Sequence, residues 1–310
     1  MNRLKFVVSL TTDDNDYQME QAGAAQEAAK RLNAEIQVLY ADNDSIAQSQ
    51  QLLKIIQSGK DGHPDGILLE PVGATALPQV AQAAARAGIA WGILNREVEY
   101  ISELRKSFGV PAFCITSDHV EIGRIQGRQF ASLLPKGGVV LYIQGPSESS
   151  ASKERTAGMS ETKPSNIEIK LLRANWTEAS AYKSVTAWLR LSTSQRARVD
   201  LVAAQDDSMA VGAKKALHEI ADTTLRGRWL GVPYTGVDGL PKTGQAWVRR
   251  GLLAATVVVP PNAGKALEIM ARALQTATLP PDRTSYPSHS FPPLDELVVA
   301  QAEKIRLFSR

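Results

Sequence analysis

The sequence predicts an α/β protein made of two doubly wound domains, and two observations support this prediction. Short apolar runs alternate with longer segments of helical pattern from the first residues onward. The alternation also occurs in two series of similar length, one over residues 6–94 and one over residues 138–237. Continuous apolar runs are typical of parallel strands covered by helices on both faces. We therefore expect two similar domains, each with a parallel sheet of right-handed βαβ units.

The first series contains four strand-like runs, namely FVVSL (6–10), IQVLY (36–40), GILLE (66–70) and IAWGIL (89–94). The segment QMEQAGAAQEAAKRL repeats apolar positions at helical spacing and is rich in Ala, Glu and Gln, which predicts a helix. The next helix is expected to begin at a cap, Asp44 or Ser45, and to stop at Gly59.

The second series has the strand-like runs GVVLYI (138–143), IEIKLL (167–172), DLVAA (200–204) and the run from Trp229 to Val237. Helical patterns separate them, in ASKERTAGM, TEASAYKSVTAWLRL and DSMAVGAKKALHEI. A further strand, ATVVV, and a further helix remain after both series are counted, and these pieces are available to the first domain. The Pro- and Ser-rich stretch YPSHSFPPLDELV is predicted to be an extended crossing segment.

Composition excludes several classes of function. The 310 residues, 44% of them apolar, are enough for two buried cores, and the net charge of +3 does not call for a polyanionic partner. The basic clusters at 190–198 and 225–229 lack the aromatic residues of a nucleic-acid groove, so no nucleic-acid partner is expected. The single cysteine, Cys114, excludes an intramolecular disulfide. No uncharged apolar run is long enough to predict a membrane span.

The sequence contains none of the common catalytic or cofactor motifs. GxxxxGK[ST], GxGxxG and GxSxG are absent, and the four histidines are scattered without metal-ligand spacing. We therefore expect no catalytic residues, no cofactor and no metal. Paired carboxylates occur at Asp13–Asp14 and Asp206–Asp207, each between a strand run and a helix. At such places one Asp commonly caps the helix while the other faces solvent.

The residues that follow the predicted strands carry more information. Ligands of open parallel sheets bind beyond the carboxyl ends of the strands. The segments at these ends are rich in Asn, Asp, Gln and Arg, with Tyr17 and Trp176 as the aromatic members. Carboxylates and amides pair with hydroxyl groups, Arg holds two oxygens at once, and ring faces cover C–H patches. This set is suited to a neutral ligand with many hydroxyl groups.

At this point the chain resembles the sugar-binding family of periplasmic binding proteins, which shares its fold with the effector domains of lac-repressor-type regulators. The resemblance rests on the order and spacing of separated segments, namely VVSLTTDDNDYQMEQAGAAQEAAKRL, PDGILLEPVGATAL, GIAWGILNRE, ITSDHVEIGRIQG, SASKERTAGM, AAQDDSMAVGAKKAL, TGVDGLP and GLLAATVVVPPNAGKALE. It implies the type I fold, in which a hinge of three strands, near residues 116, 259 and 287, joins two Rossmann-like domains. The implied ranges are 1–116 with 260–287, and 117–259 with 288–310.

Carried over residue by residue, the resemblance nominates eight ligand-binding residues: Asn15, Tyr17, Asn95, Arg96, Arg155, Trp176, Asp206 and Asp238. In this interpretation the two aromatic rings enclose a sugar ring, the two arginines hold oxygens, and the two aspartates accept hydroxyl hydrogens. Gln18 and Asp14 are weaker nominees.

Each of four nominees also has a purely structural interpretation. Trp176 can be a rim or core aromatic, and Arg155 can form an ion pair with Glu154 or Glu161. Asp206 can be only a helix cap, and Asp238 only a turn residue before Gly239.

The sequence departs from the family pattern at several positions. Asn95 stands where the family commonly has Asp, and Asp206 stands where Asn is common. Val259 replaces a Gln or Asn, and the segment 97–113 is longer than the usual loop. The identity of the ligand therefore cannot be carried over from the family.

The expected function is non-catalytic binding of a monosaccharide or similar ligand in an interdomain cleft that closes at the hinge. The expected partner is an ABC permease, and the chain is expected to be a monomer. One alternative is the effector-sensing domain of a regulator, and another is an enzyme on a doubly wound fold. The apolar run at Leu4 leaves no room for an export signal. We expect a periplasmic protein whose signal has been removed, with a cytoplasmic protein as the alternative.

Overall fold

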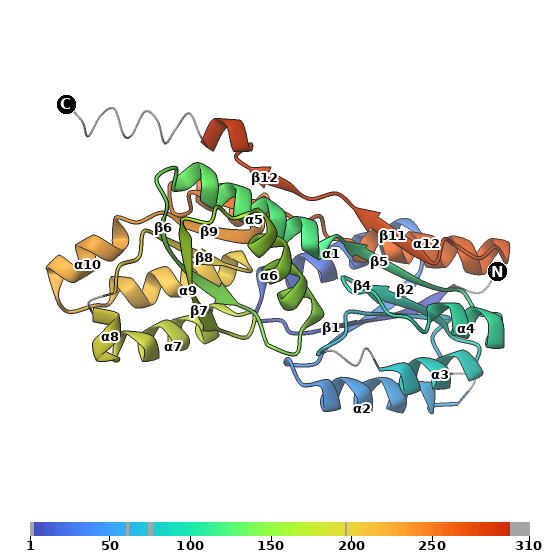
Figure 1. Ribbon diagram of the computed structural model, residues 1–310. Coiled ribbons are helices and arrows are strands. Elements are labelled where there is room, and N and C mark those ends of the chain that lie inside the picture. Colours follow the sequence, from blue (N-terminus) through green and yellow to red (C-terminus); the bar gives the residue numbers. More distant parts are fainter. Residues whose placement is uncertain (1–2, 60–61, 74–76, 196, 298–310) are drawn as a thin grey trace. The chain divides into compact units, whose positions relative to one another are not determined.

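In a computed structural model of the chain, residues 3–59, 62–73, 77–195 and 197–297 are described (Figure 1). The chain divides into two compact units, the first unit comprising Met1–Ser117 with Pro261–Tyr286 and the second unit Asp118–Pro260 with Pro287–Arg310. The chain therefore passes between the units three times. The predicted domain boundaries stay a prediction, and their last stretch, 298–310, lies outside the described residues, as do residues 74–76 of the segment PDGILLEPVGATAL.

The first unit is built on a six-stranded sheet in the order β11-β5-β4-β3-β1-β2, with every neighbouring pair parallel. Its strands are β1 (Lys5–Leu10), β2 (Glu35–Tyr40), β3 (Gly66–Leu69), β4 (Ala90–Leu94), β5 (Ala112–Ser117) and β11 (Arg283–Tyr286). Its helices are α1 (Asp16–Arg31), α2 (Ser45–Ile56), α3 (Pro78–Arg86), α4 (Ile101–Phe108) and α12 (Ala263–Thr276).

The second unit repeats this plan in a sheet of order β12-β10-β9-β8-β6-β7, in which β12 runs antiparallel to β10 and the other pairs are parallel. Its strands are β6 (Gly138–Gln144), β7 (Ile167–Arg173), β8 (Leu201–Ala204), β9 (Tyr234–Asp238), β10 (Ala255–Val258) and β12 (His289–Phe291). Its helices are α5 (His119–Leu133), α6 (Ser150–Thr162), α7 (Glu178–Leu189), α8 (Ser192–Gln195), α9 (Asp207–His218), α10 (Thr223–Leu230) and α11 (Gly244–Arg249).

The predicted fold class, α/β with two doubly wound sheets, is confirmed, and four local interpretations are corrected. Trp229 lies in α10, so the strand of that segment begins at Tyr234. The strand of ATVVV pairs in the second sheet as β10, and only the helix that follows, α12, belongs to the first unit. The segment 97–113 contains helix α4. The stretch predicted to be extended, residues 286–298, begins at the last residue of β11 and contains β12, but residues 294–297 are helical, so the prediction is wrong there.

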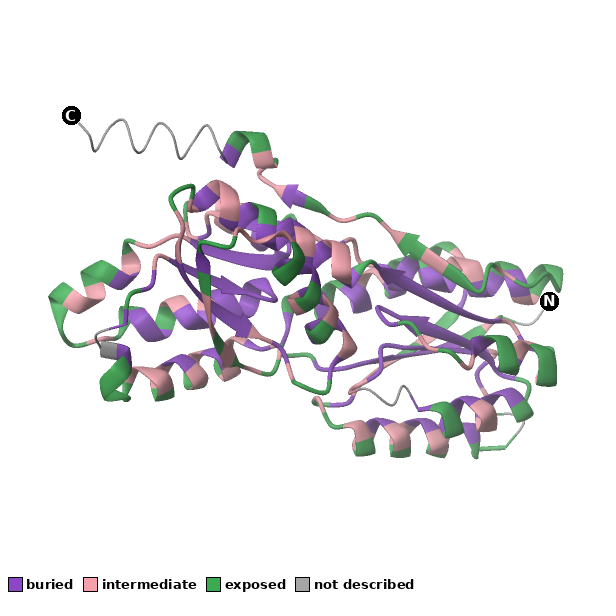
Figure 2. Cartoon of the chain, viewed as in Figure 1, coloured by how far each residue is buried: buried purple, intermediate pink, exposed green. Residues whose placement is uncertain are grey.

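Apolar residues are buried on both faces of each sheet, in four clusters (Figure 2). Along β1, Phe6 and Val8 pack with α1 and α12, whereas Val7 packs with α2 and α3 on the other face. The same alternation separates Leu141 from Tyr142 along β6. Because side chains alternate across a strand, an apolar strand fills both layers of core.

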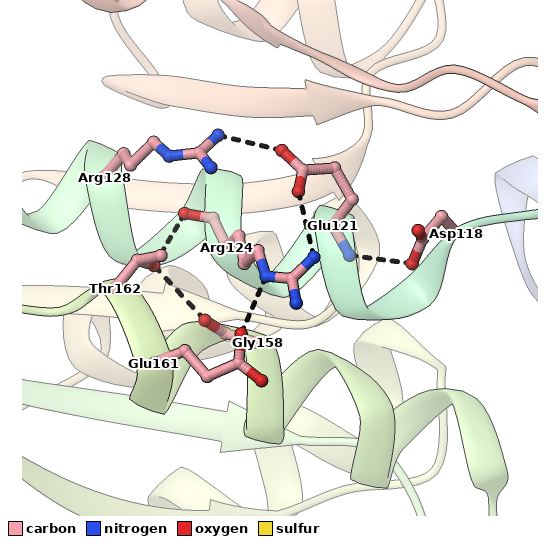
Figure 3. A network of polar contacts seen from close by, with 7 residues as sticks. All are labelled: Asp118, Glu121, Arg124, Arg128, Gly158, Glu161 and Thr162. Atoms are coloured by element: carbon pink, nitrogen blue, oxygen red, sulfur yellow. Dashed lines mark hydrogen bonds and ion pairs between the residues drawn. The ribbon is translucent and has the colours of Figure 1, made fainter.

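Helices α5 and α6 approach closely through glycine. A Cβ placed on Gly158 would lie 1.9 Å from the carbonyl oxygen of Val120, and one on Gly123 would lie 2.0 Å from that of Arg155. Side chains also join the two helices. Thr162 Oγ1 donates to the carbonyl oxygen of Arg124 at 2.8 Å, and the Arg124 guanidinium pairs with Glu161 at 2.7 Å (Figure 3). Exposed ion pairs contribute little, so the backbone contact at the glycines sets the distance between the helices.

Candidate functional site

All eight nominated residues lie at or just beyond the carboxyl ends of parallel strands, or in the first two turns of the helices that follow. Four belong to the first unit, and we call them the first cluster (Asn15, Tyr17, Asn95 and Arg96). Four belong to the second unit and form the second cluster (Arg155, Trp176, Asp206 and Asp238). This is the end of an open parallel sheet at which ligands bind.

The start of α1 sets the position of two members of the first cluster. Asn15 is the N-cap, and its side chain accepts a hydrogen bond from the backbone N–H of Gln18 at 3.1 Å. The Gln18 side chain in turn accepts from the backbone N–H of Thr11 at 3.2 Å, which ties the helix to the end of β1. Tyr17 lies in the first turn and is buried. The weaker nominee Asp14 is exposed, as is Asp13, and neither caps the helix.

Asn95 is the centre of a buried polar network in the first unit. Its Oδ1 accepts from Asn262 Nδ2 at 2.7 Å and from the Tyr17 hydroxyl at 3.3 Å. Its Nδ2 donates to Glu70 Oε2 at 3.0 Å. Gln21 joins from α1, donating to Asn262 Oδ1 at 2.9 Å. The structure thus brings Tyr17 and Asn95 together and fixes both.

Arg96 follows Asn95 directly and is 9% exposed. Its Nη1 donates to the Asn95 carbonyl oxygen at 2.7 Å, so the guanidinium is held close to its own backbone. A buried, oriented guanidinium at this edge of the sheet can donate hydrogen bonds to ligand oxygens.

In the second unit, the pattern of α6 directs Arg155 into the protein. The buried residues of this helix recur at helical spacing and form one stripe: Ala151, Ser152, Arg155, Gly158 and Met159. Arg155 Nη1 donates to the carbonyl oxygen of Gln205, and its Nε donates to His119 Nδ1 at 3.4 Å. Glu161 is bound by Arg124 instead, so the predicted alternative of an Arg155–Glu161 ion pair is not what the structure shows.

Trp176 stacks close to this arginine. The Arg155 Cζ lies 5.6 Å from the centre of the indole ring, a cation–π distance. The ring also covers Gly145, where a Cβ would lie 2.2 Å from Cζ2 of the indole. Trp176 is half-buried. Its ring is therefore held by its neighbours while part of it stays accessible, as an aromatic platform for a ligand requires.

Gln205, which is fully buried, connects the strands around this arginine. Its Oε1 accepts from the backbone N–H of Gly145 at 2.9 Å, and its Nε2 donates to the hydroxyl of Tyr142 at 3.1 Å and to the carbonyl oxygen of Ser152 at 2.9 Å. Burial raises the pKa of Tyr142. The Tyr142 hydroxyl therefore stays protonated and donates to Gln126 Oε1 at 2.7 Å.

The two aspartates of the second cluster are joined through Asp207. Asp206 is the N-cap of α9 and accepts from the backbone N–H of Met209 at 2.5 Å, so the cap interpretation is correct as far as it goes. Asp207 does not face solvent. Its carboxylate accepts from Gly239 N at 2.8 Å and from Thr256 Oγ1 at 2.7 Å. Asp207 thereby fixes the turn that begins at Asp238.

Backbone conformation independently marks three of the nominated residues. Asn95, Trp176 and Asp238 have φ values of 55°, 61° and 106°. Only eight non-glycine residues of the described chain have positive φ, and three of them are among the nominated residues. For Trp and Asp this conformation costs on the order of 1 kcal/mol or more, and such strained residues cluster at ligand sites.

The described part of the chain holds no group of three or more His, Cys, Asp or Glu side chains that could bind a metal ion. Two cavities, of about 570 and 490 Å³, occur in the first unit. One lies at the amino ends of β1 and β2 and the other beside α12, and neither is lined by a nominated residue. We give more weight to the strand ends, because that is where such sheets bind ligands.

Sequence reasoning missed Glu70 and Gln205. Glu70 follows β3 and Gln205 follows β8. In the first sheet β2 and β3 lie on opposite sides of β1, and in the second sheet β7 and β8 lie on opposite sides of β6, so both residues stand at a switch point. That position was the available signal.

The comparisons with known proteins agree with this architecture. Residues 6–278 match the family model described as a periplasmic binding protein domain. The chain belongs to the periplasmic binding protein family. No described helix is long and apolar enough to cross a membrane. The match covers nearly the whole of the first unit and most of the second.

Among relatives of this periplasmic binding protein, a xylitol-binding protein of Mycolicibacterium smegmatis is 31% identical over 216 residues. That alignment covers 68% of this chain and 55% of the relative. A putative rhizopine-binding protein of Rhizobium meliloti is 31% identical over 198 residues, 62% of this chain and 60% of the relative. The matches therefore span little more than half the length of these two relatives.

A solved structure shows that the fold extends over the whole chain. The periplasmic binding protein component of the arabinose ABC transporter from Shewanella sp. ANA-3 has a TM-score of 0.78 to this chain and 20% sequence identity. The superposition covers 98% of this chain and 97% of the other. The predicted type I periplasmic binding protein fold is confirmed.

Proposed function

We propose that this chain binds a small, neutral, polyhydroxylated ligand without converting it chemically, and delivers it to an ABC permease. The observation that carries this proposal is that each unit, by itself, holds an aromatic ring and an arginine at the carboxyl ends of its strands. In the first cluster these are Tyr17 and Arg96, and in the second Trp176 and Arg155. The names of the relatives, which concern xylitol, rhizopine and arabinose, support the same class of ligand.

In this proposal the two clusters bind opposite sides of one ligand. The rings of Tyr17 and Trp176 cover its C–H faces, and the two guanidinium groups donate to its oxygens. Asp206 and Asp238 accept hydrogen bonds from its hydroxyl groups. The three passages of the chain between the units act as a hinge, and closure excludes water from the polar contacts. The permease then recognises the closed form.

A thermal-shift panel of xylitol, D-ribose, L-arabinose and myo-inositol tests the binding function. A ligand at one hundred times its dissociation constant stabilises the native state by about 2.7 kcal/mol, so a rise of a few degrees in melting temperature is expected. Trp176→Ala is expected to reduce this rise sharply, because it removes one aromatic face. The matched control is Leu171→Ala, since Leu171 is 54% exposed on the nearby strand β7. If no ligand of the panel raises the melting temperature, the proposal is contradicted.

Two further measurements test the remaining parts. The ligand recovered after long incubation is expected to give an unchanged NMR spectrum, whereas a new product would make the chain an enzyme. Small-angle scattering is expected to show a smaller radius of gyration with ligand than without it, and an unchanged radius would contradict hinge closure. Size-exclusion chromatography is expected to give a monomer, and cell fractionation is expected to place the protein in the periplasm.

A further inference from the structure

Glu70 stands at the switch point of the first sheet. It follows β3 directly, and β3 lies between β1 and β4. Its backbone N–H donates to the carbonyl oxygen of Ser9 at 2.9 Å, and its own carbonyl oxygen accepts from Gln48 Nε2, also at 2.9 Å. Gln48 is fully buried and accepts from the backbone N–H of Val72 at 2.9 Å. The main chain at Glu70 is thus fixed from both sides.

The Glu70 side chain is a buried carboxylate with little compensation from the protein. The residue is 4% exposed, and among the described residues it takes part in no ion pair. Its carboxylate receives one side-chain hydrogen bond within that part of the chain, from Asn95 Nδ2 at 3.0 Å. A carboxylate has about four acceptor sites. The other oxygen, Oε1, is not among the buried side-chain atoms that lack a partner in the described residues, so it stays accessible and can accept a hydrogen bond from a ligand.

The chemistry of Asn95 matches this carboxylate. Its amide nitrogen faces Glu70 while its oxygen receives the amide of Asn262 and the hydroxyl of Tyr17. An aspartate at position 95 would place two carboxylates about 3 Å apart, and like charges at that distance cannot both stay ionised. An acid after one strand and an amide after its neighbour therefore form a matched pair. The acid and the amide could trade places, but two acids could not replace them.

We propose that Glu70 is the acidic acceptor of the first cluster, that it determines specificity for ligands with two adjacent hydroxyl groups, and that Asn95 is its positioning residue. This inference rests on the proposed function. The two carboxylate oxygens are spaced to accept from a pair of neighbouring hydroxyls. The negative charge strengthens both bonds relative to a neutral amide.

The variant Glu70→Gln tests the role of the charge. Gln keeps the shape, and its oxygen can still accept from Asn95, so the melting temperature without ligand is expected to stay within a few degrees of wild type. Affinity for the panel ligand that wild type binds best is expected to fall about 10- to 100-fold, because hydrogen bonds to a charged group are lost. Glu35→Gln is the matched control, since Glu35 is exposed at the amino end of strand β2 in the same sheet.

A charge exchange distinguishes ligand contact from a structural role. Asn95→Asp alone is expected to weaken binding and to lower the melting temperature without ligand, because it opposes two carboxylates. The double variant Glu70→Gln/Asn95→Asp puts the acid on β4 and the amide on β3. It is expected to regain the melting temperature and about tenfold in affinity over Glu70→Gln. A merely structural carboxylate would give no recovery of affinity.

The outcomes separate the two levels of the argument. If no panel ligand shifts the wild-type protein, the proposed function is wrong and this inference falls with it. If wild type responds and Glu70→Gln binds equally well, only the inference is wrong. If the double variant binds no better than Glu70→Gln, the proposal that Asn95 positions the ligand-binding carboxylate of Glu70 is wrong.

Discussion

The two clusters lie at equivalent ends of two sheets with the same strand order, yet they are held in place in different ways. In the first unit, side chains bind one another across long sequence distances, as Gln21 does with Asn262, 241 residues away. In the second unit, side chains also bind one another, as Gln205 does with Tyr142, but the residues around Arg155 are in addition tied to the main chain. Arg155 and Gln205 donate to carbonyl oxygens, and the helix that carries Arg155 contacts α5 through glycine.

This difference predicts different sensitivities. A network of amides tolerates changes of surrounding volume better than a reversal of one donor or acceptor, because each buried polar atom left without a partner costs about 1–3 kcal/mol. A helix placed by backbone contact responds to added volume, because close-packed interiors accommodate extra atoms poorly. The first cluster should therefore fail by hydrogen-bond mismatch and the second by overpacking.

The largest effect is expected for Gly158→Ala. The new methyl group would lie 1.9 Å from the carbonyl oxygen of Val120 and must push α5 and α6 apart. The free energy of unfolding is expected to fall by about 3 kcal/mol, the upper end for overpacking. Because Arg155 lies on the same helix, ligand affinity should fall as well. Urea unfolding and ligand titration of the purified variant measure both effects.

Gly23→Ala in α1 is the control, since a Cβ at Gly23 meets no atom within 4 Å. There the exchange is expected to stabilise the protein by about 0.5–1 kcal/mol, as Gly-to-Ala changes in open helix positions do. If both exchanges changed the unfolding free energy equally, the close contact of α5 and α6 would not make the second unit more sensitive to added volume.

The second largest effect is expected for Asn262→Asp, which changes no volume. It replaces the amide nitrogen that donates to Asn95 Oδ1 at 2.7 Å and to the Ile115 carbonyl oxygen at 3.2 Å with an acceptor. The unfolding free energy is expected to fall by about 2 kcal/mol. Asn175→Asp, at an exposed position, is the control and should have almost no effect. If urea titrations give Asn262→Asp the same unfolding free energy as wild type, the amide network does not hold the first cluster in place.

Much of the fold could be predicted from sequence because buried parallel strands are continuous apolar runs. The prediction was wrong where a helix end and a strand lie next to each other and both are apolar. Trp229 lies in the last turn of helix α10, which ends at Leu230, and its bulk and the apolar residues after it give the segment the pattern of one long strand. The partner of ATVVV could not be predicted either, because an apolar strand fits either sheet until the neighbouring strands compete for it. Its pairing with β9 depends on the whole second unit.

The nominated residues followed from their position after strands, but their partners could not be deduced. From the sequence, Asn95 stands where an acid is expected, whereas the structure shows an acid, Glu70, one strand away. Such a pairing is set by the order of strands in the sheet, in which β3 and β4 are neighbours, and not by distance along the sequence. The positive φ of Trp176 likewise has no signature in its residue type.

The smallest predicted effect concerns Cys114 and shows where the polar network of the first unit ends. Cys114 packs in the apolar cluster beneath α3 and α4, whereas the carbonyl oxygen of the next residue, Ile115, accepts from Asn262. Burial raises the pKa of the Cys114 thiol to about 11, from 9.0. The thiol is therefore expected to react with a thiol reagent at pH 8 only when the protein unfolds.

The same shift predicts a dependence of stability on alkaline pH. Because the folded-state pKa lies above the unfolded value, the contribution to stability is complete below pH 9 and is lost as the pH rises from 9 to 11. At pH 10 the loss is about 1.4 kcal/mol relative to pH 8. Comparing wild type with Cys114→Ala at both pH values isolates this loss, since the tyrosines titrate in both proteins. If wild type and the variant lose the same stability, water reaches Cys114, and the polar region of the first unit extends through the sheet to its other face.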